Sequence, residues 1–215
     1  MEFGGTVSAG STLVPKILGS YERELHAVIA RILATEHSDI VDIGCAEGYY
    51  AVGFAMLFPR AAVHAFDTSP RARRLCSEMA RLNGVAERLI LGGRCDDTTL
   101  ERLALGDRAL ILSDCEGYEA RLFTGRVAAR LAAHDVLIEV HDALDPDLSK
   151  RLQALFEHTH DVTVVESIDD KRKLRNGGFP EIAGYDTKTQ HRLVSEGRHG
   201  LMEWLYFTPK RPGGR

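Results

Sequence analysis

The amino-acid sequence predicts an α/β protein built on one open, mostly parallel sheet. Short apolar runs that suit strands alternate with longer segments that suit helices, as in repeated β-α units. Several runs, such as ALIL at 109–112 and VLIEV at 136–140, are almost continuously apolar, as expected for strands that helices cover on both faces. Acidic residues follow most of these runs, at the sheet edge where open α/β sheets bind ligands. We therefore expect a doubly wound sheet with its site at that edge.

The strands and helices can be placed along the chain. A Gly-, Ser- and Thr-rich arm at 1–18 is expected to be flexible, and Ser20 to cap a helix that ends near His37. Pro70 and Asn83-Gly84 bound a helix expected at 70–82. The expected strands are 40–43, 62–66, 88–91, 109–112, 136–140, 162–165 and 202–207. A further helix is expected to begin at 49, and three more are expected at 98–105, 118–132 and 148–158.

Residues 168–200 break this rhythm. The segment is charged and Gly-rich, and it is too long for an ordinary connection. We expect an insertion or lid before the last strand, with a short helix at 187–196. The sequence has no visible repeat or domain boundary, so 1–215 is expected to form a single domain.

Composition argues against several classes of protein. A formal net charge of −4 gives no polyanion-binding surface, so no nucleic-acid partner is expected. No apolar run approaches the roughly 20 residues of a membrane helix. The N-terminus lacks the basic start and apolar centre of a signal peptide, so we expect a cytoplasmic protein. The four cysteines form no CxxC pair and are expected to be reduced; Cys45, Cys95 and Cys115 follow strands and would line one cleft.

The stretch 41–50 (VDIGCAEGYY) predicts a cofactor loop. A strand turns through Gly44 and Gly48 into a helix, which brings backbone N–H groups and a helix N-terminus close to a ligand. The dinucleotide-binding GxGxxG pattern would require a glycine at Tyr49, so the spacing argues against NAD. Asp67 follows roughly 20 residues later, where an acid accepts ribose hydroxyls.

The ordered set of segments resembles the class I S-adenosylmethionine (SAM) methyltransferases, and within them the FkbM-like family. Asp42-x-Gly44-x-Ala46-x-Gly48 is similar to their first motif, with Ala46 in place of the middle glycine. HAFDTSPRARRLC and LGGRCD look like the second strand with its helix and the adenine-edge segment, and SDCEGYEARLF and VLIEVHD look like the D-x-E-G-x-E and E-x-H segments. The similarity spans about residues 19–208. It implies a Rossmann-like seven-stranded sheet whose antiparallel last strand is inserted between two others.

The resemblance also implies SAM as cofactor and assigns residues to it. Gly44 and Gly48 would wrap the methionine part, Asp67 would hold the ribose, and Asp96 or Cys95 would meet the adenine. Asp114 would face the methyl sulfonium. The residues expected at the donor site are Asp42, Gly44, Cys45, Ala46, Gly48, Asp67, Thr68, Cys95, Asp96 and Asp114.

On the acceptor side, His141 and Asp114 are the candidate catalytic residues. A hydroxyl acceptor must lose a proton, and a histidine suits that task near neutral pH. Asp114, Glu139 and Asp142 could instead collect a divalent cation, because hard cations prefer carboxylate oxygens. Metal-assisted deprotonation would then replace the histidine base. Strand alternation puts Glu139 and His141 on one face, where they could share a ligand.

We expect methyl transfer to a hydroxyl of a small molecule, a sugar or another metabolite. Residues 114–117 read Asp-Cys-Glu-Gly, not the Asn/Asp-Pro-Pro-aromatic segment of many base- and amide-modifying methyltransferases. The alternatives are an NAD-linked oxidoreductase on a similar sheet and a SAM-binding module without catalysis. The apolar face of the last strand could also join a homodimer.

Overall fold

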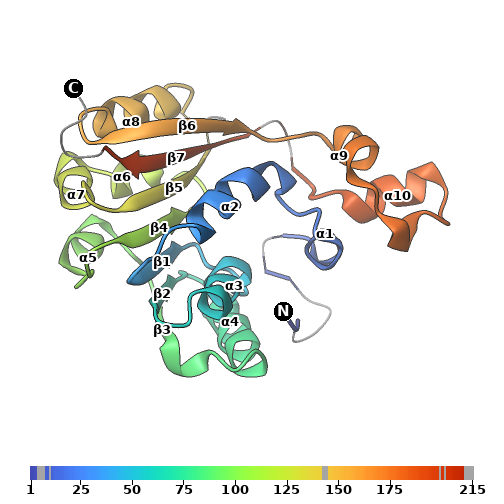
Figure 1. Cartoon of the computed structure of the whole chain (residues 1–215), viewed down its shortest axis with the longest axis horizontal. Helices are drawn as coiled ribbons and strands as arrows, with labels where there is room; N and C mark the ends of the chain where they lie inside the picture. Colours follow the sequence, from blue (N-terminus) through green and yellow to red (C-terminus); the bar gives the residue numbers. More distant parts are fainter. Residues whose placement is uncertain (4–7, 10, 142–144, 199, 201, 211–215) are drawn as a thin grey trace.

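The computed structural model describes residues 1–3, 8–9, 11–141, 145–198, 200 and 202–210. Its sheet has seven strands in the order β3-β2-β1-β4-β5-β7-β6 (Figure 1). β7 runs antiparallel between β5 and β6, and the other neighbouring pairs are parallel, so the predicted sheet with an inserted antiparallel last strand is confirmed. The strands are β1 (Asp39–Ile43), β2 (Ala62–Phe66), β3 (Leu89–Gly92), β4 (Ala109–Ser113), β5 (Asp135–Val140), β6 (His160–Glu166) and β7 (Glu203–Pro209).

Helices cover both faces of this sheet. One face carries α2 (His26–Leu33), α3 (Tyr49–Leu57) and α4 (Pro70–Leu82), and the other carries α5 (Asp97–Arg102), α6 (Glu119–Leu122), α7 (Gly125–Arg130) and α8 (Leu148–Phe156). In β1, Ile40 belongs to the core of the first face and Val41 to that of the second. Burial on both sides explains why the central strands are continuous apolar runs.

Three further helices lie beyond the carboxyl edge of the parallel strands. They are α1 (Leu13–Leu18), α9 (Asp170–Gly177) and α10 (Thr187–Val194), and Figure 1 shows α9 and α10 projecting past this end of the sheet. The longest described helix, α4, has 13 residues, and no helix in the described ranges is long and apolar enough to cross a bilayer.

The N-terminal part differs from the sequence prediction. Ser20 closes α1 instead of capping the next helix, because the backbone N–H groups of Ser20 and Tyr21 both donate to the carbonyl of Pro15. Gly19, with φ of 67°, supplies the left-handed turn that this closure needs. A 3-10 turn at Arg23–Leu25 then leads into α2, which ends at Leu33 and not near His37.

Two other segments are also divided differently. The helix expected at 118–132 is two helices, because the hydroxyl of Thr124 accepts a hydrogen bond from the Val127 N–H (3.3 Å) and starts α7 afresh. In 168–200 the structure has α9, a 3-10 turn at Pro180–Ile182 and α10. Asp169 and Asp186 cap these two helices by accepting from the N–H groups of Arg172 and Thr189.

Asp135 holds the opposite, amino-terminal edge of the sheet. Its fully buried carboxylate accepts hydrogen bonds from His37 Nε2 (2.8 Å) and from Arg108 Nε (2.8 Å) and Nη2 (2.9 Å). Burial raises the pKa of Asp135, but these bonds and the charge of Arg108 outweigh it and hold the pKa below its usual range. The start of β5 is thereby joined to the residues before β1 and β4.

Replacing Asp135 with Asn is expected to lower the free energy of unfolding by about 2 kcal/mol, because it leaves the buried His37 and the partly exposed Arg108 without their charged partner. Since the folded-state pKa lies below the unfolded one, this stability is present above about pH 4 and is lost as the pH falls through the folded pKa. Urea unfolding between pH 2 and 7 measures both effects. The exposed Asp161→Asn serves as the control, and equal losses in the two variants would contradict the assignment.

Candidate functional site

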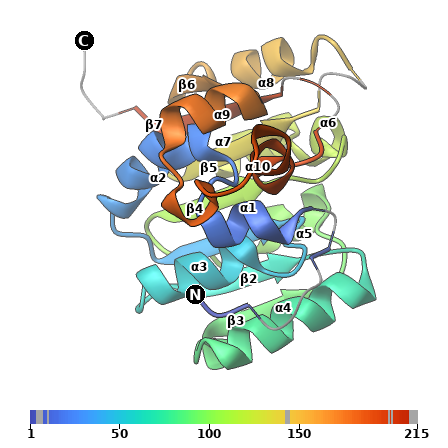
Figure 2. The same cartoon turned by 90° about the vertical axis from the view of Figure 1, so that its right-hand side faces the viewer.

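A cavity of about 1130 Å³ lies at the carboxyl edge of the sheet. It is lined by residues that follow β1, β2, β3, β4 and β5, together with residues of α1 and of the segment before β7. Figure 2 faces this edge, where α1 and α10 lie against each other in front of the sheet. Small-molecule sites usually measure about 300–1,000 Å³, so the cavity has room for a cofactor and a second small molecule.

The turn after β1 is shaped for close backbone contact. Gly44 and Gly48 have φ of 90° and 93°, a region that favours glycine. A Cβ on Gly44 would lie 1.8 Å from the carbonyl oxygen of Asp114, and one on Gly48 would lie 2.7 Å from Sγ of Cys76. Ala46 also has a left-handed conformation (φ 47°), which explains why related turns can use glycine there.

Asp67 joins this turn to the start of α4. Its Oδ2 accepts from the N–H of Ala46 (3.0 Å) and its Oδ1 from the N–H of Ser69 (2.7 Å). Each oxygen keeps a lone pair for a further donor, such as a ribose hydroxyl. Asp67 and Thr68 both line the cavity.

Most residues predicted for the donor site meet at the cavity. Those that line it are Asp42, Gly44, Cys45, Ala46, Asp67, Thr68, Cys95 and Asp114. Gly48 and Asp96 are not among the lining residues. Gly48 stands at the N-terminus of α3, and Asp96 caps α5 by accepting from the N–H (2.8 Å) and the hydroxyl (2.6 Å) of Thr99.

Asp42 is a buried acid with an unused acceptor. Asp42 belongs to β1 and its side chain is buried. Among the described residues, its Oδ2 has no hydrogen-bond partner. Burial, followed by the negative charges of Asp114 and Asp67, raises the pKa of Asp42 to about 7. Because a buried acceptor without a donor is costly, an ammonium group in the cavity would stabilise this carboxylate.

The three strand-end cysteines line the same cavity, as predicted. Burial, with a smaller contribution from nearby carboxylates, raises the pKa of Cys95 and of Cys115 to about 12. The contact with Cys76 and burial raise the pKa of Cys45 as well. These thiols are therefore protonated at neutral pH, which makes them poor nucleophiles.

His141 is held in one orientation by Glu119. Its Nδ1 lies 2.7 Å from Oε1 of Glu119, whose side chain is fully buried, so Nε2 is directed toward the cavity. Burial lowers the pKa of His141, but the hydrogen bond and the charges of Glu119, Asp114 and Glu116 outweigh it and raise the pKa. The same contact lowers the pKa of Glu119 against the effect of its burial. The pair therefore resembles the histidine–carboxylate pairs that act as general bases.

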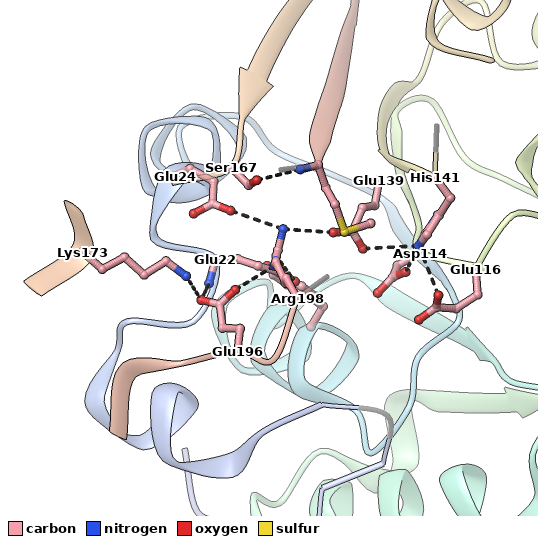
Figure 3. A network of polar contacts seen from close by, with 12 residues as sticks. Glu22, Glu24, Asp114, Glu116, Glu139, His141, Ser167, Lys173, Glu196 and Arg198 are labelled. Carbon is pink, nitrogen blue, oxygen red and sulfur yellow. Dashed lines mark hydrogen bonds and ion pairs between the residues drawn. The ribbon is translucent and has the colours of Figure 1, made fainter. Parts of the chain in front are cut away.

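Carboxylates surround the free nitrogen of His141. Nε2 lies 3.7 Å from Asp114 Oδ1, 3.4 Å from Glu116 Oε2 and 4.0 Å from Glu139 Oε2 (Figure 3). One ligand atom each from Asp114, Glu139 and His141 lie within 4.8 Å of one another, which is close enough to share a metal ion. The third predicted metal ligand, Asp142, lies outside the described residues.

Arg198, from the 168–200 segment, enters this group of acids. Figure 3 shows its guanidinium between Glu139 (3.3 Å) and three other carboxylates, those of Glu22 (3.2 Å), Glu24 (3.5 Å) and Glu196 (2.9 Å). Glu196 also pairs with the buried Lys173 of α9. The segment thus borders the cavity and contributes a cation to it.

Burial raises the pKa of several acids around Arg198 and His141. Burial raises the pKa of Glu22 to about 7 in spite of Arg198 and the hydrogen bond from Tyr50. Burial and the charge of Asp114 raise the pKa of Glu139 to about 10. Asp114 itself has a raised pKa, with burial as the main cause. A ligand with positive charge would favour their ionised forms.

Two residues at or beside the cavity were not found from the sequence. Lys16 of α1 is buried, forms an ion pair with Glu47, and lies over the rings of Tyr21 (4.6 Å) and Tyr49 (5.1 Å). Nothing periodic in the arm marks this lysine. Glu119 was also missed as a partner of His141, although it is the last acid of the D-x-E-G-x-E segment.

Comparisons with known proteins agree on the fold. No family model and no curated protein matches the chain. A solved precorrin-6y C5,15-methyltransferase from Geobacter metallireducens GS-15 aligns with a TM-score of 0.57 at 18% identity, over 87% of this chain and 88% of that one. A SAM-dependent methyltransferase from Geobacter sulfurreducens, in complex with S-adenosyl-L-homocysteine, aligns with a TM-score of 0.52 at 16% identity, over 87% of this chain and 91% of that one.

The chain has the fold of the class I SAM-dependent methyltransferases. A putative O-methyltransferase from Klebsiella pneumoniae is a further example, with a TM-score of 0.53 at 13% identity over 91% of this chain and 89% of that one. At such identities the likeness establishes the fold alone.

Replacing Gly44 with Ala is expected to lower the affinity for S-adenosylhomocysteine at least about tenfold and to lower the melting temperature, because strain at positive φ adds to the clash with Asp114. Calorimetry and thermal unfolding measure the two effects. Gly53→Ala in α3 is the matched control, since a Cβ there meets nothing within 4 Å. If the Gly44 variant binds and melts like the control, the turn does not depend on close backbone contact.

Proposed function

We propose that the protein is a SAM-dependent methyltransferase that transfers a methyl group to a hydroxyl of a small molecule, a sugar or another hydroxylated metabolite. The observation that carries this proposal is the Glu119–His141 pair, which faces the cavity beside Asp114. The D-x-E-G-x-E and E-x-H segments contain all three residues and support the FkbM-like family.

The residues around the turn suit the donor. Backbone at 44–46 and the carboxylate of Asp42 would hold the methionine part, Asp67 the ribose hydroxyls and Cys95 the adenine edge. The unsatisfied Oδ2 of Asp42 fits a positively charged ammonium, and the raised pKa of Asp114 falls when a cation is bound near it. When bound, SAM supplies an electrophilic methyl group on a positively charged sulfur.

His141 would take the proton of the acceptor hydroxyl. Its Nε2 is the free nitrogen on the cavity side, while Glu119 accepts from Nδ1–H and stabilises the imidazolium that forms. Asp114 lies next to this nitrogen and would orient the hydroxyl between donor and base. Glu119 is accordingly a positioning residue.

A divalent cation is the second candidate for activating the hydroxyl. Asp114, Glu139 and His141 converge, and the Oδ1 of Asp114 is buried without a hydrogen-bond partner among the described residues. A histidine whose other nitrogen binds a carboxylate is also typical of metal ligands. The cation would act as a Lewis acid on the hydroxyl oxygen. Chelation separates the two mechanisms: activity that EDTA removes and Mg²⁺ restores would favour the cation over the base.

Donor binding tests the assignment of the site. Asp67→Ala and Asp114→Ala are each expected to weaken S-adenosylmethionine binding at least about tenfold in calorimetry, because each loses a charge-assisted contact, while circular dichroism stays native. Exposed Asp107→Ala is the control. Unchanged affinity in both variants would remove these residues from the site. Tight binding of NADH, followed by fluorescence, would instead favour an oxidoreductase.

Variants of the His141 pair test catalysis. His141→Asn is expected to bind SAM normally yet to lose transfer of labelled methyl groups to a panel of sugars and polyols, unlike the exposed His158→Asn. Because neutral His141 is the active form and its pKa is raised, activity should increase with pH through that pKa. Glu119→Gln should move this increase to lower pH and reduce the maximal rate about tenfold or more. SAM binding without turnover in the wild type would point to a binding module.

A further inference from the structure

A pair of acids on the far side of the cavity is not used by the chemistry above. Glu166 ends β6 and Glu203 begins β7, and the two are directly opposite each other in the antiparallel ladder. Both line the cavity. Opposite residues of such a pair project to the same face, where two like charges destabilise the sheet.

The two acids cannot separate by fraying of the strand ends. Directly beyond them, the N–H of Ser167 donates to the carbonyl of Met202 (2.8 Å), and the N–H of Met202 donates to the hydroxyl of Ser167 (2.8 Å). The fold therefore keeps the two residues opposite each other at the edge of the cavity, Glu166 exposed and Glu203 half-buried.

The cations of the cavity wall are engaged elsewhere. Lys16, Arg94 and Arg198 are the lysine and arginine residues among the lining residues. Lys16 pairs with Glu47, and Arg94 lies over the ring of Tyr118 (5.5 Å). Arg198 pairs with four other acids and with neither member of this pair.

The pair also contains an unsatisfied acceptor. Within the described ranges, Oε1 of Glu203 is buried and has no hydrogen-bond partner. Nine acidic residues line the cavity against three lysines and arginines, and a positively charged ligand would favour their ionised forms. An unpaired acceptor among them suits a cationic donor.

We propose that the methyl acceptor carries a protonated amine, which binds between Glu166 and Glu203 while a hydroxyl of the same molecule reaches His141. This inference rests on the proposed function and narrows its substrate class to amino alcohols and amino sugars. An ammonium group offers three N–H donors, which suits two facing carboxylates.

Matched amine and alcohol probes test the inference. Glucosamine with glucose, tyramine with tyrosol, and 2-aminocyclohexanol with 1,2-cyclohexanediol would be titrated by calorimetry into the protein saturated with S-adenosylhomocysteine and kept in EDTA. At least one amine is expected to bind about ten- to a hundredfold more tightly than its neutral partner, as hydrogen bonds to charged groups allow. If no amine is preferred, the inference is overturned.

The variants Glu166→Gln and Glu203→Gln should reduce this preference to less than about threefold, while the exposed Glu181→Gln keeps it. Neither substitution should lower the melting temperature, because each removes a like-charge repulsion. A preference that survives both substitutions overturns the inference. The inference is also overturned if the wild-type protein binds Mg²⁺, loses that binding in Glu203→Gln and shows no preference for amines.

The proposed function can fail separately. If S-adenosylhomocysteine does not bind the wild-type protein, the donor assignment is wrong whatever the probes do. If it binds, and neutral acceptors bind as well as amines and are methylated, only the acid-pair inference is lost.

Discussion

The contact between the turn after β1 and the backbone after β4 is the constraint on which the site depends. β1 and β4 are adjacent and parallel, and beyond their last paired residues the N–H of Asp114 still donates to the carbonyl of Ile43 (2.9 Å). The missing side chain of Gly44 allows the two backbones to meet. As a result, the loop that suits the donor and the acid that would face its methyl group share one wall. Any side chain at position 44 would push them apart.

The second constraint is electrostatic. Packing several carboxylates at a partly closed edge raises their pKa values, because burial and mutual repulsion both disfavour the charged forms. Arg198 compensates part of this charge from the 168–200 segment. Destabilised carboxylates of this kind are typical of sites that bind cations. The sulfonium donor and the amine-bearing acceptor proposed above are both cations. Folding stability alone would not favour so many buried acids at one edge of the sheet, which indicates a functional site.

The sheet and the donor loop could be predicted from the sequence because their signals are local. Mostly apolar runs mark β1, β4 and β5, and the spacing of Gly44 and Gly48 reports a backbone conformation that few other residues adopt. The break at Thr124 was readable as a cap, but the apolar pattern continues across it and favoured one long helix. Lys16 could not be found this way. Its ion pair with Glu47 joins segments far apart in the chain, and it lies in no periodic pattern.

The order of the strands also affects how the molecule is made on the ribosome. β7 follows β6 in the chain but lies between β5 and β6, so β6 has no partner until β7 has been synthesised. Arg198, which neutralises acids placed as early as Glu22, is also synthesised shortly before β7. A nascent chain that has passed β6 therefore exposes an open edge on β5 and an uncompensated group of acids, a state in which chains are prone to aggregate or to bind chaperones. Sheet closure and charge neutralisation then occur together, late in synthesis.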